Sequence, residues 1–134
     1  MSIEMRYLLA AVVLTALLRV PWLLNKVSVR GLQKISGYPS ESEPLAAWAR
    51  RLWYAHEDAL DNLILFTPLI LLLEATEVSS AISRLAAATY FWARLTHAIV
   101  YAFAIPWLKM LAYSTAFISL LALAWELAVR AANF

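Results

Sequence analysis

The chain has 134 residues, of which 63% are hydrophobic and 15% are charged, and its formal net charge is +2. This composition excludes an ordinary soluble globular domain and predicts a single integral membrane domain over residues 1–134. Cysteine is absent, which excludes disulfides, thiolate metal sites and a cysteine nucleophile. The basic residues are dispersed along the chain, so nothing favours nucleic-acid binding.

The first predicted membrane span runs from Tyr7 to Leu24 and is interrupted near its end by Arg19 and Pro21. This apolar run is longer than that of a signal peptide and no cleavage site follows it, so we expect a retained helix. Arg19 can extend its side chain to the lipid headgroups. Residues 25–44 contain both glycines and are expected to form a loop.

Three more predicted spans follow this loop. The second covers about residues 45–75, and a short turn at 77–80 leads to the third, at about 81–105. Pro106 ends the third span, and the fourth covers about residues 107–129. The predicted fold is therefore an all-α integral membrane protein, a four-helix transmembrane bundle.

The second span is charged in its first half. Only residues 63–73 are apolar enough to face lipid, and they cover about 16 Å, roughly half of a hydrocarbon core. An ionised side chain at mid-bilayer costs at least about 2.5 kcal/mol, so Arg51, Asp58 and Asp61 must face other helices or a polar cavity. They share one arc of the helix, and this polar stripe is too wide to be covered within one subunit. We therefore expect the stripe to pack at a subunit boundary or around a symmetry axis.

A second polar face lies on the third span, at spacings of four, three and four residues: Tyr90, Arg94, His97 and Tyr101. Arg94 stands among apolar and aromatic residues, so Asp58 or Asp61 is expected to pair with it. Such a pair can also be purely structural. His97 and Tyr101 can each serve a ligand or a helix contact. No metal-ligand spacing is present, so we expect no metal site.

Lysine and arginine counts predict the orientation of the bundle. Six of these residues lie on the side of the first loop and third turn, and three lie on the side of the termini. The more basic side faces the cytoplasm, so both termini are expected outside it. The charged half of the second span then lies at the cytoplasmic leaflet.

Two stretches carry a specific pattern. Residues 49–62 read ARRLWYAHEDALDN and lead to Phe66, whereas residues 93–101 read ARLTHAIVY and are followed by IPWLK at 105–109. Together with Arg30-Gly31-Leu32, they resemble the small bacterial members of the MAPEG family, the membrane-associated proteins in eicosanoid and glutathione metabolism.

The resemblance implies a multi-pass protein of the bacterial inner membrane that forms a homotrimer. It also implies glutathione bound between adjacent subunits, held as a thiolate by positive charge, and a lipophilic small molecule as substrate. The glutathione-binding residues that the resemblance implies are Arg51, Asp58, Asp61, Arg94, His97, Tyr101 and Lys109.

Four positions depart from the family pattern. Tyr54 stands in place of an arginine, Asp58 in place of an asparagine, Asp61 in place of a glutamate and Lys109 in place of an arginine. Glutathione is itself an anion, so the first two exchanges weaken its attraction by two charge units. The sequence therefore predicts weak glutathione binding or none.

Two functions remain open at this level. One is a glutathione-dependent transferase or peroxidase that acts on lipophilic substrates. The other is a non-enzymatic lipid-binding or partner-binding scaffold with a degenerate glutathione site. A proton-coupled exporter is a weaker alternative, because the first span offers Arg19 rather than a lone carboxylate. No catalytic residue is identified, and a lipophilic pocket leaves no chemical signature of its substrate.

Overall fold

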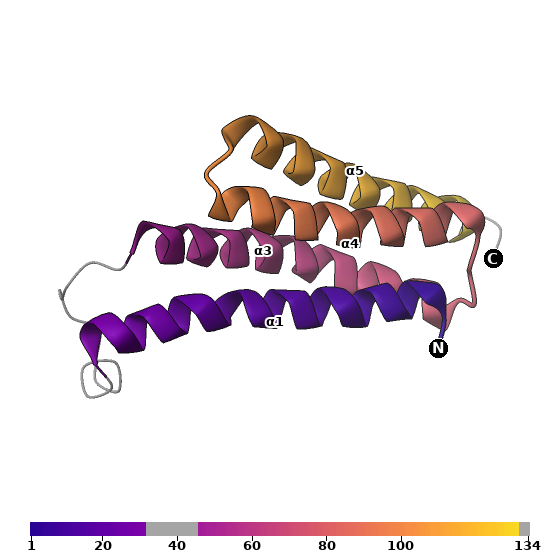
Figure 1. Cartoon of the computed structure of the whole chain (residues 1–134). Coiled ribbons are helices and arrows are strands. Elements are labelled where there is room, and N and C mark those ends of the chain that lie inside the picture. Colours follow the sequence, from indigo (N-terminus) through magenta and orange to yellow (C-terminus); the bar gives the residue numbers. More distant parts are fainter. Residues whose placement is uncertain (32–45, 132–134) are drawn as a thin grey trace.

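The computed structural model describes residues 1–31 and 46–131, which form four α-helices and no strand. The helices are α1 (Ile3–Arg30), α3 (Ala47–Ala75), α4 (Ala81–Ala102) and α5 (Pro106–Ala131). They lie lengthwise beside one another, with the start of α1 and the end of α5 at the same end of the bundle (Figure 1). The predicted all-α, four-helix fold is confirmed.

The first helix is longer than its predicted span. α1 continues through Pro21 to Arg30, so the expected loop is wrong for residues 25–30, and residues 32–44 of that loop lie outside the described chain. No second breaker follows Pro21 within α1, and Gly31, with φ 81°, is the first residue that favours a stop. One proline removes a helix hydrogen bond without ending the helix.

Two short turns join α3, α4 and α5. The turn predicted at 77–80 is present, and Ser80 and Ser83 cap the start of α4 by exchanging side-chain and backbone hydrogen bonds. α4 ends at Ala102, three residues before its predicted end. α5 begins at Pro106, whose fixed φ and missing N–H suit the first turn of a helix.

The hydrophobic core occupies one half of the bundle, the half that holds the start of α1 and the end of α5. Phe66 of α3 stacks on Tyr90 of α4 with ring centroids 3.9 Å apart, and both side chains are almost fully buried. The buried apolar residues of this core are Leu8, Ala11, Phe66, Ile70, Leu73, Ala86, Ala87, Tyr90, Ala93, Ala116, Leu120 and Leu123.

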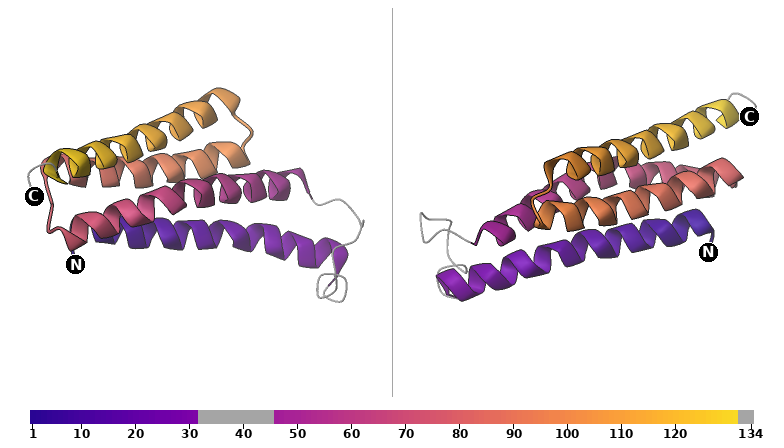
Figure 2. Two further views of the ribbon diagram at one scale, coloured as in Figure 1. Left: turned by 180° about the vertical axis from the view of Figure 1, so that it is seen from behind. Right: turned by 45° about the horizontal axis from the view of Figure 1, so that its top comes forward.

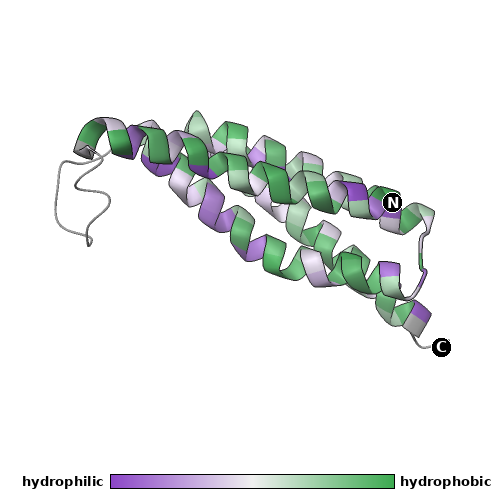
Figure 3. Ribbon diagram, turned by 90° about the horizontal axis from the view of Figure 1, so that it is seen from below, coloured by the Kyte–Doolittle hydropathy of each residue, from purple (hydrophilic) through white to green (hydrophobic). Residues whose placement is uncertain are grey.

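Two of the four helices are long and apolar enough to cross a membrane. They are α1, over residues 3–29 with a mean hydropathy of 2.0, and α5, over residues 106–130 with a mean hydropathy of 1.5. Much of the ribbon in Figure 3 has the colour of hydrophobic residues. α3 carries more charged residues than any other helix, and α4 contains the buried polar residues Arg94 and His97, so a lipid environment requires these polar side chains to be covered.

The helices differ in how far they extend beyond the turn at residues 103–105. α4 has 22 residues, which corresponds to about 33 Å and so to the thickness of a hydrocarbon core. The end of α1 and the start of α3 project beyond this turn (Figures 1 and 2). We call the half of the bundle with the turn at 103–105 the open half, and the half with the hydrophobic core the closed half.

Candidate functional site

Polar side chains of α4 point into the open half of the bundle. Arg94 and His97 are buried, and Tyr101 is half-buried. The rings of His97 and Tyr101 meet edge to face, with centroids 5.4 Å apart. The polar face predicted on this helix is confirmed, and it is directed toward the other helices of the subunit.

Arg94 lacks most of the partners that a buried guanidinium needs. Its side chain is only 3% exposed, and its Nη2 lies 3.4 Å from Nδ1 of His97. Its Nε and Nη1 have no hydrogen-bond partner among the described residues. The ring of Tyr113 lies 6.0 Å from the guanidinium carbon and offers only its π face. An unsatisfied buried polar group costs about 1–3 kcal/mol, so these N–H groups form an incomplete binding site.

The expected ion pair between Arg94 and Asp58 or Asp61 does not form within the subunit. The Oδ2 atom of Asp58 lies 3.7 Å from Nε2 of His97, so the imidazole stands between the carboxylate and the guanidinium. A neutral His97 that carries its proton on Nε2 fits both contacts, because it can accept from Arg94 and direct its N–H toward Asp58. The ion pair fails because a histidine one turn along α4 occupies the intervening space.

A small cationic pocket adjoins this group at the end of α4. Its volume is about 220 Å³, and its lining includes Arg51, Tyr101 and Lys109 but no carboxylate. The Nε atom of Arg51 donates to the backbone oxygen of Ala102 at 3.1 Å, which satisfies a free carbonyl at the end of α4. The Nζ atom of Lys109 lies 4.7 Å from the ring centroid of Tyr101. Helices α3, α4 and α5 each contribute one polar side chain to the pocket.

The polar stripe of α3 is only partly covered by its own subunit. Tyr54 is 56% exposed, Asp61 is exposed and the side chain of Asp58 is 39% exposed. Asn62 is buried, but its Nδ2 has no hydrogen-bond partner in the described ranges. Asp61 lies ten residues beyond Arg51, which corresponds to about 15 Å along the helix axis. The stripe therefore runs deep along the bundle with its polar groups uncovered.

The structure gathers six of the seven predicted site residues and leaves Asp61 at the exposed edge of α3. The six that lie together are Arg51, Asp58, Arg94, His97, Tyr101 and Lys109. No group of three or more His, Asp or Glu side chains that could hold a metal ion occurs in residues 1–31 and 46–131.

Two residues of this half were not assigned to it from the sequence. Tyr113 faces Arg94 and also lies 6.1 Å from the ring of His97, and its spacing of four from Lys109 is the signal that could have placed it. His56 is buried, and its Nδ1 lies 2.8 Å from the backbone oxygen of Thr15 in α1. His56 therefore joins α3 to α1 on the side away from the cationic pocket.

In the closed half, unlike at Arg94, the buried charged groups have hydrogen-bond partners. Glu4 is 2% exposed and accepts hydrogen bonds from two serine hydroxyls, including that of Ser83 at 3.1 Å. Glu126 is also buried, and it accepts from Ser80 at 2.8 Å and from Arg130 at 3.3 Å. Both buried carboxylates therefore have partners within the subunit.

Comparison with known proteins places the chain in a family. No curated protein and no solved structure matches it. The model of the MAPEG family matches residues 8–129, a range that includes α3, α4, most of α1 and α5, and every residue of the site. The chain therefore belongs to the MAPEG family, whose members include glutathione transferases and related proteins.

Proposed function

We propose that this chain forms a trimeric membrane protein that binds glutathione or a closely related anionic thiol. The protein either conjugates this thiol to a lipophilic substrate or uses it to reduce that substrate. The observation that carries the proposal is the buried guanidinium of Arg94, two of whose nitrogens lack partners in the described part of the chain. An anionic acceptor such as a carboxylate suits these free N–H groups, because hydrogen bonds between ionised partners are the strongest ones in proteins.

The residues that are present fit an anionic tripeptide. Arg51 and Lys109 supply positive charge at the pocket, and Tyr101 can donate a hydrogen bond. Arg94 would hold a carboxylate of the ligand, while Lys109 and Tyr101 would lie nearest its thiol. Positive charge beside a thiol favours the thiolate, which is the nucleophile that the ligand supplies.

Asp58 limits the strength of this binding. Its carboxylate is linked to Arg94 through His97 and interacts favourably with Arg94 and Lys109, so part of their positive potential is already neutralised. Glu57 and Asp61 add negative charge close to Asp58. We therefore expect glutathione to bind weakly, as the sequence predicts, and a thiol ligand with less negative charge to bind better.

A trimer would complete the site. The pocket of about 220 Å³ is smaller than the roughly 300–1,000 Å³ of sites for drug-sized ligands, so one subunit offers only part of a site. Asp61 is exposed about 15 Å further along α3 than Arg51, at a depth where lipid contact is costly, and a neighbouring subunit would cover it. Native mass spectrometry from a gentle detergent is expected to give trimers, and monomers alone would contradict this arrangement.

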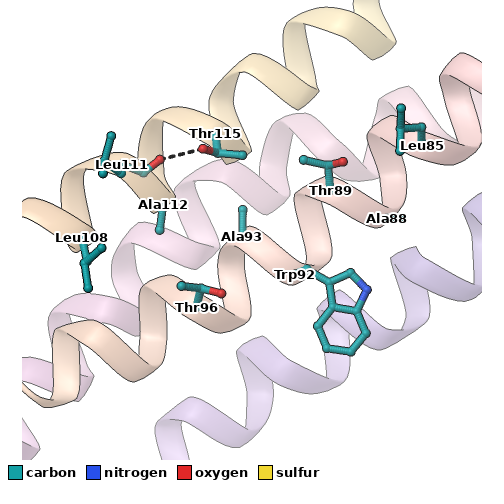
Figure 4. Close-up of a pocket in the computed structure, with 10 residues that line it drawn as sticks. All are labelled: Leu85, Ala88, Thr89, Trp92, Ala93, Thr96, Leu108, Leu111, Ala112 and Thr115. Atoms are coloured by element: carbon teal, nitrogen blue, oxygen red, sulfur yellow. Dashed lines mark hydrogen bonds between the residues drawn. The ribbon is translucent and has the colours of Figure 1, made fainter.

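A second function, non-enzymatic lipid binding, is favoured by a separate apolar groove. The groove lies between α4 and α5 and has a volume of about 530 Å³, larger than the cationic pocket (Figure 4). Trp92 and Thr96 of α4 and Leu108 of α5 are among its lining residues. On this alternative the groove holds an acyl chain and the cationic pocket holds no thiol.

Calorimetry on the purified trimer tests the first function. Glutathione is expected to bind the parent weakly, and Arg94→Gln is expected to abolish the binding because it removes the charge that the carboxylate needs. Arg84→Gln is the matched control, since Arg84 is an exposed arginine at the other end of the same helix. Equal glutathione binding by the parent and Arg94→Gln would overturn the proposal. Conjugation of glutathione to an apolar electrophile is measured in parallel, and it distinguishes a transferase from a non-enzymatic scaffold.

A further inference from the structure

A cluster of two aromatic rings and two cations lies between α1 and α3 in the open half. The rings of Trp22 and Trp53 are 4.4 Å apart, centroid to centroid. The guanidinium carbon of Arg19 lies 5.4 Å from the ring of Trp22 and 5.3 Å from that of Trp53. The Nζ atom of Lys26 lies 4.9 Å from the ring of Trp22. Both cations are therefore held in place by cation–π contacts.

Among the described residues, these two cations have no acidic partner. In the part of the chain that the structure describes, no carboxylate lies within 4.0 Å of Arg19 or Lys26. In the closed half, by contrast, Arg130 is paired with Glu126. The contacts to the rings position Arg19 and Lys26 without neutralising them, so their charge remains available to an anion.

The depth of the cluster can be derived from hydrogen bonds between helices. Arg51, two residues before Trp53, donates to the last residue of α4, Ala102. The rings therefore lie level with the end of α4, a helix about as long as a hydrocarbon core is thick. In a membrane this level is the lipid headgroup region, where tryptophan is enriched.

The cluster is also separate from the proposed glutathione site. At 100° per residue, Trp53 lies roughly 150° around α3 from Arg51, which lines the cationic pocket, and from Asp58, which contacts His97. Arg19 is exposed and Lys26 is half-buried on α1. A subunit contact on the polar stripe of α3 would therefore leave this cluster accessible.

We propose that Arg19, Lys26, Trp22 and Trp53 form a binding site for the headgroup of an anionic phospholipid. The phosphate accepts from the guanidinium and the ammonium groups, and the tryptophan rings contact the glycerol region and the first carbons of the chains. A basic pocket between helices at the cytoplasmic leaflet is suited to such a headgroup. This inference does not depend on whether the cationic pocket binds a thiol.

The test uses the full-length protein after removal of lipid in a neutral detergent. Phosphatidylglycerol and phosphatidylcholine with identical chains are titrated in turn, and bound lipid is counted by native mass spectrometry. The double variant Arg19→Gln/Lys26→Gln is compared with Arg6→Gln/Arg84→Gln, which removes two exposed cations from the other end. Inorganic phosphate is titrated as a competitor to distinguish a lipid from a free phosphate.

Phosphatidylglycerol is expected to bind the parent and the Arg6/Arg84 variant equally, and the Arg19/Lys26 variant roughly 30-fold more weakly. The single variant Lys26→Gln is expected to lose about fivefold, which keeps the test decisive if the double variant does not fold. The inference is overturned if both double variants lose affinity equally, if the parent does not prefer phosphatidylglycerol, or if millimolar phosphate displaces the lipid.

Discussion

The two halves of the bundle differ in whether their buried polar side chains have hydrogen-bond partners. In the closed half, Glu4 and Glu126 are buried against serine hydroxyls and lie beside a continuous apolar core. In the open half, Arg94 and Asn62 are equally buried but keep donors without partners among the described residues. A buried polar group that the subunit does not satisfy indicates a partner from outside it. The closed half therefore holds the helices together, whereas the open half contains the buried donors, unpaired in the described chain, on which the proposed ligand site rests.

The largest expected effect comes from removing a satisfied charge. Glu4→Met keeps most of the side-chain volume but leaves the hydroxyl of Ser79 without its acceptor and breaks the hydrogen bond from Ser83, so the free energy of unfolding should fall by about 2–3 kcal/mol. Thermal unfolding in detergent measures this. Glu74→Met is the control, because Glu74 is exposed at the same end and bonds only the hydroxyl of Ser2 in the described chain. A similar loss in both variants would contradict the contrast between the two halves.

Removing the unsatisfied charge of Arg94 should instead raise the free energy of unfolding. Arg94→Met replaces a buried guanidinium that has no carboxylate partner within its subunit, so the ligand-free protein should become about 1–2 kcal/mol more stable. Chemical denaturation of the purified trimer checks this value. A loss of several kcal/mol would instead mean that a carboxylate of a neighbouring subunit pairs with Arg94.

Restoring the charges of the family pattern in the open half should raise its affinity for glutathione. Tyr54→Arg/Asp58→Asn adds a cation on the exposed stripe and removes the carboxylate that reaches Arg94 through His97. Glutathione affinity measured by calorimetry should rise about tenfold, because each change reduces repulsion of an anion. Unchanged affinity would argue that the pocket does not contact glutathione.

The smallest expected effect concerns the two turns, which both contain a non-glycine residue with positive φ. Glu77 has φ 55° and Ala104 has φ 59°, a region that is strained for L-residues. Glu77→Gly and Ala104→Gly should each raise the free energy of unfolding by about 0.5–1 kcal/mol. Ala104 lines the cationic pocket, so only its variant should also change ligand affinity. An equal change in ligand affinity in the Glu77→Gly and Ala104→Gly variants would contradict a ligand site at the cationic pocket.

Apolar runs and turn residues predicted the helices, and periodicity predicted the two polar faces, because residues three and four apart share a helix face. The alignment of Arg94, His97 and Tyr101 followed from this rule, and so did the polar arc of α3. The glutathione-binding residues were implied by the resemblance to the MAPEG family. Contacts between helices were not predictable in the same way. His97 rather than Arg94 meets Asp58, because the outcome depends on the relative shift of α3 and α4 by a single turn.

The end of α1 and the pairing of the two tryptophans were missed for a related reason. The two glycines suggested a loop over residues 25–44, yet α1 continues to Arg30, and packing of Trp22 on Trp53 contributes to holding this part of the helix. Packing of this kind joins residues about thirty positions apart. No local pattern in a single sequence reports it.

The hydrogen bond from Arg51 to the carbonyl of Ala102 has a consequence for the energetics of ligand binding. A free arginine side chain loses about 1.5–2 kcal/mol of rotamer entropy when it becomes ordered. Arg51 is held by its Nε before any ligand arrives, so most of that entropy is already lost in the folded subunit. A ligand can then form bonds to the remaining guanidinium N–H groups with a smaller entropic cost. Because Arg51 also bonds the carbonyl of Ala102, a ligand that moves Arg51 changes a contact at the end of α4.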